Sequence, residues 1–238
     1  MKEKRSHDGH RQRLKERFLN SSLDSFAPHN ILELLLFYSI PRQDTNEIAH
    51  DLIEHFGSLK RVFDADFSEL IKVNGIKENS ATLIKMIPQL ARIYFTEEPD
   101  KKALFDDAHK IGKYLVGKYI GEKKEVVYSL LLDNSFHLIK AVKMAEGNVS
   151  AVAFNSSTVI QQAIKNDAAF VVIAHNHPNG ILCPSMDDID ATSMLASSLK
   201  TVNVELLEHF LIVGDNYLPI AKESSALPKH LFTPKLKY

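Results

Sequence analysis

The feature that most constrains the fold is a run of apolar residues that ends in two histidines one residue apart. The apolar residues 168–174 are followed directly by His175, Asn176 and His177. Side chains alternate across a strand, so the two imidazoles would point to the same side. With a carboxylate from the next turn or helix, they would supply three ligands of a tetrahedral metal and leave the last position to water. The pattern therefore predicts an open zinc site of the catalytic kind.

A turn and a helix start follow the histidines in the order that such a site needs. Gly180 and Pro184 indicate the turn, and Ser185 can cap a predicted helix over 187–199 whose first turn carries Asp188. Two histidines on a strand can also be structural or surface groups. The letters His-Asn-His also invite comparison with HNH nucleases, but those residues are scattered over a longer unit. We favour the metal site because all of its parts occur in order.

Composition excludes some classes of protein. The 238 residues are 45% hydrophobic and 25% charged, with a formal net charge of −1, so no whole-chain field attracts nucleic acid or membrane. Cys183 is the single cysteine, which rules out an intramolecular disulfide and fits a reducing compartment. We find no apolar core of a secretory signal near the first residue and no apolar run long enough to span a bilayer. We expect a cytoplasmic protein without a membrane partner.

The N-terminal part is predicted to be helical, because apolar residues recur at helical spacing over 30–94. Within it, residues 70–81 resemble a helix-hairpin-helix, which we place at about 70–92. Gly75 fits the turn of that motif, whereas Lys77 stands where a second glycine is usual. The amides of such hairpins often face a DNA phosphate, and Lys77 could contact phosphate itself. The alternative is a helical packing module without a ligand.

The first residues are locally basic, which is a second candidate contact for DNA phosphates. The alternative is a solvated, partly frayed N-terminus. The basic residues of this stretch are Lys2, Lys4, Arg5, Arg11, Arg13, Lys15 and Arg17.

A polar, charged segment over 96–102 predicts a linker between two domains. The segment after it alternates strand and helix patterns, which predicts a mixed α/β domain. We therefore expect a helical domain over 1–97, a metal-binding domain over 104–223 and a tail over 224–238. The expected strands are 125–133, 136–144, 168–174, 205–213 and 217–220, and the expected helices are 106–118, 158–166 and 187–199.

The spacing His-x-His, seven residues, Ser, two residues, Asp resembles the signature of JAMM/MPN+ metalloproteases. Asn between the histidines and Pro-x-Gly after them resemble the RadC-type branch of bacterial proteins. The resemblance implies a mixed-sheet JAMM/MPN domain, similar to the cytidine deaminase fold, behind an all-α helix-hairpin-helix domain. It also implies that His175, His177 and Asp188 hold zinc and that Ser185 helps to stabilise an oxyanion. Further segments resemble RadC-type proteins at 9–14, 32–36, 41–46 and 56–59.

The same resemblance implies a glutamate general base at the start of a strand upstream of the histidines. Glu125 occupies that place, and a carboxylate beside bound zinc can accept a proton from water. Glu122 and Glu146 lie near enough in sequence to leave the choice open, and Glu125 could also be a surface residue. We expect a zinc-dependent peptidase or amidase with a peptide or protein substrate. The alternative is a DNA-associated, repair-related protein whose metal domain is structural or binds a partner.

Two segments depart from the RadC-type pattern and put substrate preference in doubt. The usual His-Pro-Arg-Glu is replaced at 155–158 by Asn-Ser-Ser-Thr, and the loop after the histidines contains Ile181, Leu182 and Cys183. Cys183 lies close to the metal ligands in sequence and could approach the zinc, but we expect it to be a small loop residue that faces the interior. His209 lies outside the motif, so we interpret it as structural.

Overall fold

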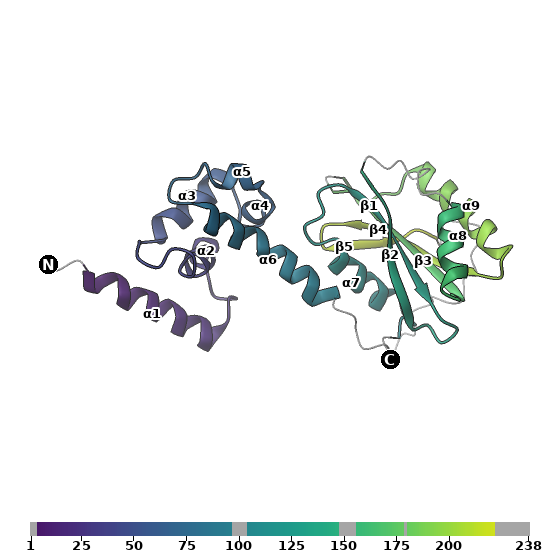
Figure 1. The fold of residues 1–238 in the computed structure, drawn as a ribbon, viewed down its shortest axis with the longest axis horizontal. Coiled ribbons are helices and arrows are strands. Elements are labelled where there is room, and N and C mark those ends of the chain that lie inside the picture. Colours follow the sequence, from purple (N-terminus) through teal and green to yellow (C-terminus); the bar gives the residue numbers. More distant parts are fainter. Residues whose placement is uncertain (1–3, 97–103, 148–155, 179, 222–238) are drawn as a thin grey trace. The chain divides into compact units, whose positions relative to one another are not determined.

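The computed structural model describes residues 4–96, 104–147, 156–178 and 180–221 (Figure 1). It divides into two compact units, residues 1–90 and 91–238. The predicted tail over 224–238 and nearly all of the predicted linker lie outside the described residues. No helix within the described ranges has both the length and the apolar character needed to cross a bilayer.

The first unit is built from helices, as its apolar spacing predicts. Gly57 ends the helix Asn46–Phe56 in a left-handed conformation with φ 84°. Glycine adopts this conformation without backbone strain because it has no Cβ atom. A core of side chains with no exposed surface joins them, including Leu32, Leu52 and Ile84. The helices are α1 (Lys4–Ser21), α2 (Pro28–Leu36), α3 (Asn46–Phe56), α4 (Leu59–Asp64), α5 (Phe67–Leu70) and α6 (Glu78–Thr96), the last of which continues into the second unit.

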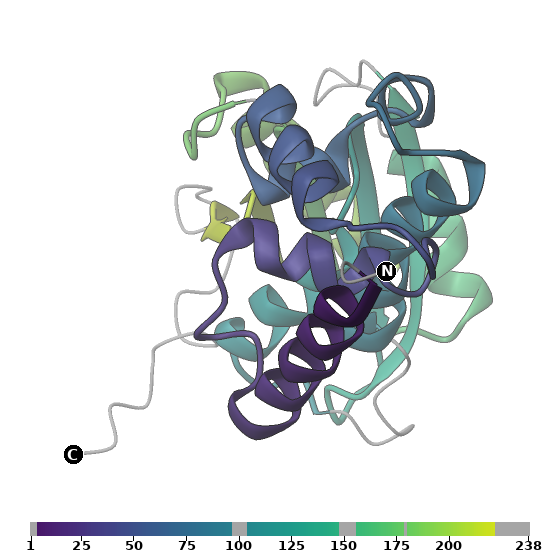
Figure 2. The ribbon, with the colours of Figure 1, turned by 90° about the vertical axis from the view of Figure 1, so that its left-hand side faces the viewer.

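The basic N-terminal stretch forms the helix α1 over the part that the structure describes, so the alternative of a frayed arm does not hold there. Leu14 of α1 packs in a small cluster with Phe26, Leu34 and Phe37 from the α2 region, and Figure 2 shows α1 beside α2. Arg11 also donates hydrogen bonds to backbone carbonyls of the loop after α2, at distances of 2.5–3.0 Å. Leu14 and Arg11 lie on the same face of α1, so the buried apolar contacts of one and the hydrogen bonds of the other together hold α1 against the α2 region.

The second unit is a five-stranded mixed sheet, which confirms the predicted α/β class. The strand order is β2-β1-β3-β4-β5, and β3 and β4 form the parallel pair. The other neighbouring strands are antiparallel. The elements are α7 (Ala108–Lys118), β1 (Glu125–Leu132), β2 (Leu138–Gly147), α8 (Ser156–Lys165), β3 (Phe170–Asn176), α9 (Met186–Lys200), β4 (Glu205–Val213) and β5 (Asn216–Pro219).

Helices cover both faces of this sheet, which explains why β3 is apolar on both sides. Val172 and Ala174 pack with α7 on one face, whereas Val171 and Ile173 pack with α8 and α9 on the other. Figure 1 shows α8 and α9 together on one side of the sheet and α7 on the other. Because the side chains alternate, His175 continues the series of Val171 and Ile173 and lies on the face covered by α8 and α9.

A β-bulge in β4 changes which residues of that strand reach each face. Val171 pairs with Leu206, but the next residue of β3 pairs with Glu208, so Leu207 is an extra residue. The alternation of β4 is therefore reversed beyond Leu207. As a result, His209 pairs with Ile173 and lies on the same face as His175. If Leu207 paired with Val172 and the alternation ran on unbroken, His209 would point toward α7.

Candidate metal centre

The three residues predicted to bind metal lie together where the end of β3 meets the start of α9. His175, His177 and Asp188 each offer one ligand atom, and these atoms lie within 4.8 Å of one another. His175 and Asp188 are buried, at 8% and 2% exposure, whereas His177 is partly exposed. The two imidazole ring centres are 5.0 Å apart. The cluster is thus partly open to solvent at His177.

The loop after β3 holds His177 beside the sheet. The backbone N–H of His177 donates to the carbonyl of Ile212 in β4 at 3.0 Å, which extends the ladder by one residue. Gly180 then turns back so closely that a Cβ atom added to it would lie 2.7 Å from Cβ of His177. A side chain at position 180 would therefore displace His177. The glycine in the His-Asn-His-Pro-x-Gly pattern has this steric role.

Asp188 is held at the start of α9 by the predicted cap. Both the backbone N–H and the hydroxyl of Ser185 donate to Oδ2 of Asp188 at 2.7 Å, and the Ser185 oxygen accepts from the Asp188 N–H at 3.1 Å. Burial alone would raise the pKa of Asp188, but the His175 imidazole and the Ser185 donors hold it well below its usual value. Asp188 is therefore an anion whose second oxygen, Oδ1, faces His175.

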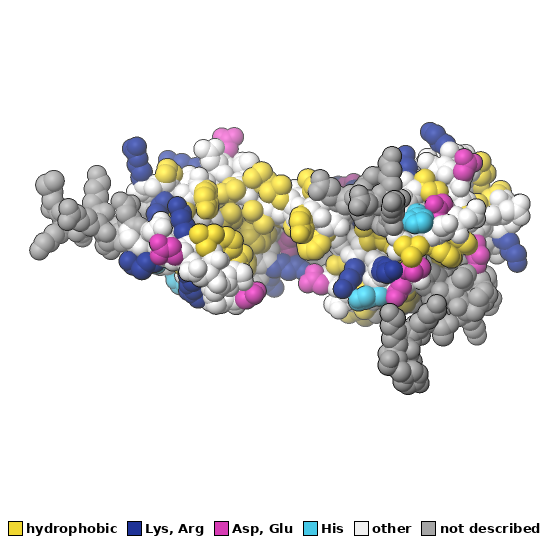
Figure 3. Space-filling view, turned by 90° about the horizontal axis from the view of Figure 1, so that it is seen from below, with side chains coloured by type: hydrophobic (Ala, Val, Ile, Leu, Met, Phe, Trp, Pro, Cys, Tyr) yellow, Lys and Arg dark blue, Asp and Glu magenta, His cyan; other side chains and the backbone are white. Residues whose placement is uncertain are grey.

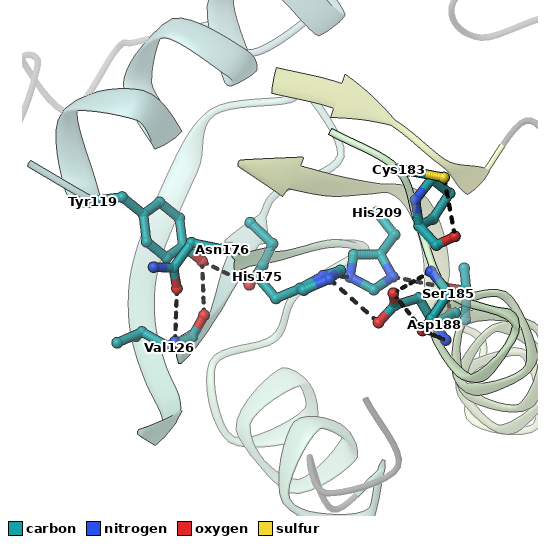
Figure 4. A network of polar contacts seen from close by, with 11 residues as sticks. Tyr119, Val126, His175, Asn176, Cys183, Ser185, Asp188 and His209 are labelled. Carbon is teal, nitrogen blue, oxygen red and sulfur yellow. Dashed lines mark hydrogen bonds and ion pairs between the residues drawn. The ribbon is translucent and has the colours of Figure 1, made fainter. Parts of the chain in front are cut away.

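The geometry around Nε2 of His175 fits a cation. This atom is buried and has no hydrogen-bond partner among the described residues, although Oδ1 of Asp188 is 3.2 Å away. Figure 4 shows the imidazole and the carboxylate turned toward each other. Buried polar atoms normally have a partner, so an orphan calls for an explanation. Two imidazoles and a carboxylate form a ligand set that catalytic zinc sites use.

A histidine outside the motif supports this pair. Nε2 of His209 lies 2.8 Å from Nδ1 of His175, and Nδ1 of His209 lies 2.6 Å from the hydroxyl of Thr192 on α9. Burial, together with the neighbouring His175, lowers the pKa of His209 well below 6.5, so its ring is neutral at neutral pH. The sequence did not predict this contact, because the bulge at Leu207 changes the face of the sheet that His209 reaches, and no sequence pattern indicates the bulge.

The residue between the two histidines holds the neighbouring strand. Asn176 points to the opposite face, where its Oδ1 accepts from the backbone N–H of Val126 at 2.7 Å. Its Nδ2 donates to the carbonyl of Lys124 at 3.0 Å. These two peptide groups flank Glu125. Asn176 therefore fixes the start of β1 against the end of β3, and with it the position of Glu125 relative to the histidines.

Glu125 lies in a cavity beside His177. Val127 pairs with His175, so Glu125, two residues earlier, belongs to the same face of the sheet. Both other candidate glutamates are engaged elsewhere: Glu122 pairs with Arg92, and Glu146 with Lys124 and Lys143. The cavity has a volume of about 630 Å³ and is lined by Lys123, Lys124, Glu125, Gly147, His177, Pro178 and Gly180.

The segments that depart from the RadC-type pattern lie near this opening or outside the described residues. Cys183 is exposed, so the expectation that it faces the interior is wrong; the loop runs over the surface before Ser185 begins the cap. Ile181 is 78% exposed beside it. Asn155 lies outside the described residues, and Ser156 is the first residue of α8.

Comparisons with known proteins agree with this arrangement. The profile of a RadC-like JAB domain matches residues 105–225, which include every residue of the cluster. A UPF0758 protein of Fusobacterium nucleatum is 35% identical over 226 residues, covering 92% of this chain and 97% of the relative. UPF0758 proteins of Acinetobacter baylyi and Cupriavidus necator are each 30% identical, over 90% and 91% of this chain and 79% and 95% of their own lengths.

The match therefore covers the sheet, the histidine pair and α9, and the relatives extend it over the helical unit. With a domain profile over half of the chain and a relative at 35% identity over most of it, the chain belongs to the RadC family and carries its RadC-like JAB domain.

Proposed function

We propose that this protein is a zinc-dependent hydrolase that cleaves an amide bond in a peptide or protein substrate. The observation that carries the proposal is the cluster of His175, His177 and Asp188, of which His177 lines the same cavity as Glu125. The RadC-like JAB domain supports a metallohydrolase of the JAMM type. When bound, zinc supplies a Lewis acid that makes water more acidic and polarises a carbonyl group.

The residues of the chain have separate roles in this proposal. His175, His177 and Asp188 hold the metal, and the buried position of two of them keeps the site rigid. Glu125 accepts the proton of the attacking water and later donates it to the leaving amine. Its place on the same face as the histidines supports this role, as do the ion pairs that engage Glu122 and Glu146.

Ser185 is proposed to donate a hydrogen bond to the oxyanion that forms at the carbonyl carbon, a contribution of about 3 kcal/mol for a well-placed donor. Its hydroxyl has a single proton, and it donates that proton to Asp188. The oxyanion role thus requires the hydroxyl to turn away from Oδ2 during the reaction. The backbone N–H of Ser185 also donates to Oδ2, so Asp188 stays anchored when the hydroxyl turns.

The test combines metal content with turnover. Elemental mass spectrometry should find about one zinc per chain in the wild type and none in Asp188→Ala, while Glu125→Gln keeps its zinc. A library of internally quenched peptides should be cleaved by the wild type and 10²- to 10⁴-fold more slowly by Glu125→Gln. No zinc in the wild type after reconstitution would overturn the metal site. Equal turnover by Glu125→Gln would overturn the assignment of the base.

A second candidate function is DNA binding by the helical unit, and one observation favours it. Gly75 adopts a left-handed φ of 85° in the turn before α6, and Lys77 is exposed at the start of that helix. This geometry resembles the turn of a helix-hairpin-helix, whose amides face phosphate. Against it, Figure 3 shows Lys and Arg interspersed with Asp and Glu, and Arg11 is occupied by backbone carbonyls.

Fluorescence anisotropy with labelled single-stranded and duplex DNA tests this second candidate. We expect binding that weakens steeply with salt and that Lys77→Glu weakens further, because phosphate contacts release counterions. Lys60→Glu, a charge reversal elsewhere on the exposed surface of the same unit, is the matched control. Binding that is unchanged in Lys77→Glu would rule out this turn as the DNA contact.

A further inference from the structure

We propose that Thr192 and His209 are positioning residues, which fix the tautomer of His175 through a one-way chain of hydrogen bonds. The chain keeps Nε2 of His175 unprotonated and aimed at the metal. The inference rests on the proposed metal site, but it concerns how the protein prepares a ligand and not the reaction itself. It is carried by three contacts between buried residues of β3, β4 and α9.

The direction of the chain is set at Thr192. Its oxygen lies 2.5 Å from the backbone carbonyl oxygen of Asp188. A carbonyl can only accept, so the single hydroxyl proton of Thr192 must lie in this contact. The hydroxyl therefore has no proton left for His209. In its contact with Nδ1 of His209, Thr192 accepts, and Nδ1 must carry the proton.

The contact with Thr192 also fixes the direction of the next hydrogen bond, between His209 and His175. A neutral imidazole has one nitrogen that donates and one that accepts. Because Nδ1 of His209 donates to Thr192, Nε2 is the accepting nitrogen. Nε2 lies 2.8 Å from Nδ1 of His175, and two unprotonated nitrogens would repel at this distance. Nδ1 of His175 therefore carries a proton and donates it to His209.

This leaves Nε2 of His175 as the nitrogen available for a metal. That atom lacks a hydrogen-bond partner among the described residues and lies 3.2 Å from Oδ1 of Asp188, and a cation between these two acceptors would offset their mutual repulsion. Nitrogens that bind metals usually have their partner nitrogen tied to a carboxylate or a carbonyl, which fixes the ring orientation. Here a neutral histidine takes that place. The chain also starts at the carbonyl of Asp188, so one set of contacts links two of the proposed ligands.

The experiment removes one hydroxyl and measures zinc affinity. Thr192→Val keeps the shape of the side chain but can neither accept from His209 nor donate to Asp188. Thr192→Ser restores the hydroxyl. Ser129→Ala is the matched control, because Ser129 is buried on the same face of the sheet and its hydroxyl has no hydrogen-bond partner among the described residues. Zinc dissociation constants are measured by chelator competition, and long-range ¹H–¹⁵N spectra report the proton on each histidine ring.

We expect zinc to bind 10- to 100-fold more weakly to Thr192→Val, as is typical when the outer partner of a metal ligand is removed. Thr192→Ser should bind zinc like the wild type to within about threefold, which is small beside that loss. Ser129→Ala should not change the affinity. In the wild type, the ring spectra should show a proton on Nδ1 of His175. Wild-type affinity in Thr192→Val, or an unprotonated Nδ1 on His175, would overturn the proposal.

The outcomes separate this proposal from the proposed function. If zinc binds, Thr192→Val weakens it and no amide substrate is cleaved, the positioning chain stands and the hydrolase assignment falls. If Thr192→Val binds zinc normally and amides are cleaved, the reverse holds. If the wild type binds no zinc, the metal site is wrong, and the ring spectra then decide the direction of the hydrogen bonds independently.

Discussion

The two faces of the sheet treat the buried polar groups at the end of β3 in different ways. On the face covered by α7, Asn176 and Tyr119 are buried, and their polar atoms bond to backbone groups of β1 and β3. On the face covered by α8 and α9, His175 is also buried, but one of its nitrogens lacks a hydrogen-bond partner among the described residues. Adjacent residues of one strand supply both arrangements.

The difference separates a structural network from the proposed metal site. A buried network whose members are all bonded gains rigidity and holds the chain in one arrangement. A buried atom that lacks a partner costs free energy unless something else satisfies it. The α7 face thus sets the position of β1 and Glu125, whereas the α9 face leaves Nε2 of His175 facing the proposed metal site.

The largest effect should come from Asn176→Asp, which changes only the hydrogen-bond network on the face covered by α7, here called the structural face. Aspartate cannot donate to the Lys124 carbonyl, and its charge would be buried beside that oxygen. We expect the unfolding free energy to fall by about 3 kcal/mol, because a buried acceptor is left facing another acceptor. Urea unfolding of the chelator-treated protein measures it, with exposed Asn74→Asp as the control. Loss of zinc without loss of stability would contradict the division between the faces.

Acidification should lower the stability of the protein because His209, on the face covered by α8 and α9, becomes protonated. Burial lowers the pKa of His209 in the folded protein below 6.5, the usual value for the unfolded chain. At a pH between the folded and the unfolded pKa, His209 is therefore protonated in the unfolded chain and neutral in the folded protein. Stability from this group is complete above pH 6.5 and is lost as the pH falls below it, by at most about 1.4 kcal/mol per unit. Unfolding of the metal-free protein at pH 7 and pH 5 should show this loss, and His209→Gln should remove it. An identical pH dependence in the variant would argue against a neutral His209.

A smaller effect is expected from Tyr119→Phe on the structural face. The Tyr119 hydroxyl donates to the Ala174 carbonyl at 2.7 Å, directly before His175. Its loss should lower the unfolding free energy by about 1 kcal/mol, the usual net value of one hydrogen bond. Zinc affinity should stay unchanged, and exposed Tyr38→Phe serves as the control. A tenfold loss of zinc affinity would mean that the two faces are coupled.

The smallest effect should come from Cys183→Ser. Cys183 is exposed on the loop before α9, so the change should alter stability by less than about 0.5 kcal/mol. Zinc content should stay the same, measured by elemental mass spectrometry beside the wild type. A drop in zinc content would show that the thiol takes part in the site.

The sequence predicts the proposed metal ligands better than it predicts the residues that hold them in place, such as Thr192 and His209. His175, His177 and Asp188 follow from the parity of a strand and from a helix start, which are both local features. The structure brings these three together. The ladder also places Glu125 on their face, because Val127 pairs with His175. The class of the second unit follows from the alternation of strand and helix patterns.

The supporting residues depend on features that are not local. Thr192 lies four residues after Asp188, so a helical pattern puts both on one side of α9. Nothing local indicates that this side meets His209, because the meeting depends on the order of β3 and β4 in the sheet and on the bulge. The interior position expected for Cys183 failed for a related reason. The path of an irregular loop is set by what surrounds it and not by its own residue types.

The extra residue at Leu207 makes the register of β4 as important as its composition. Leu206 and His209 reach the same face although their numbers differ by three, because Leu207 takes no place in the alternation. If Leu207 instead paired with Val172, every later residue of β4 would shift by one position along β3 and change faces. Phe210 would then turn toward Thr192, and His209 would turn into the apolar layer under α7. A change of register alone would therefore dismantle the site with every one of its residues still present.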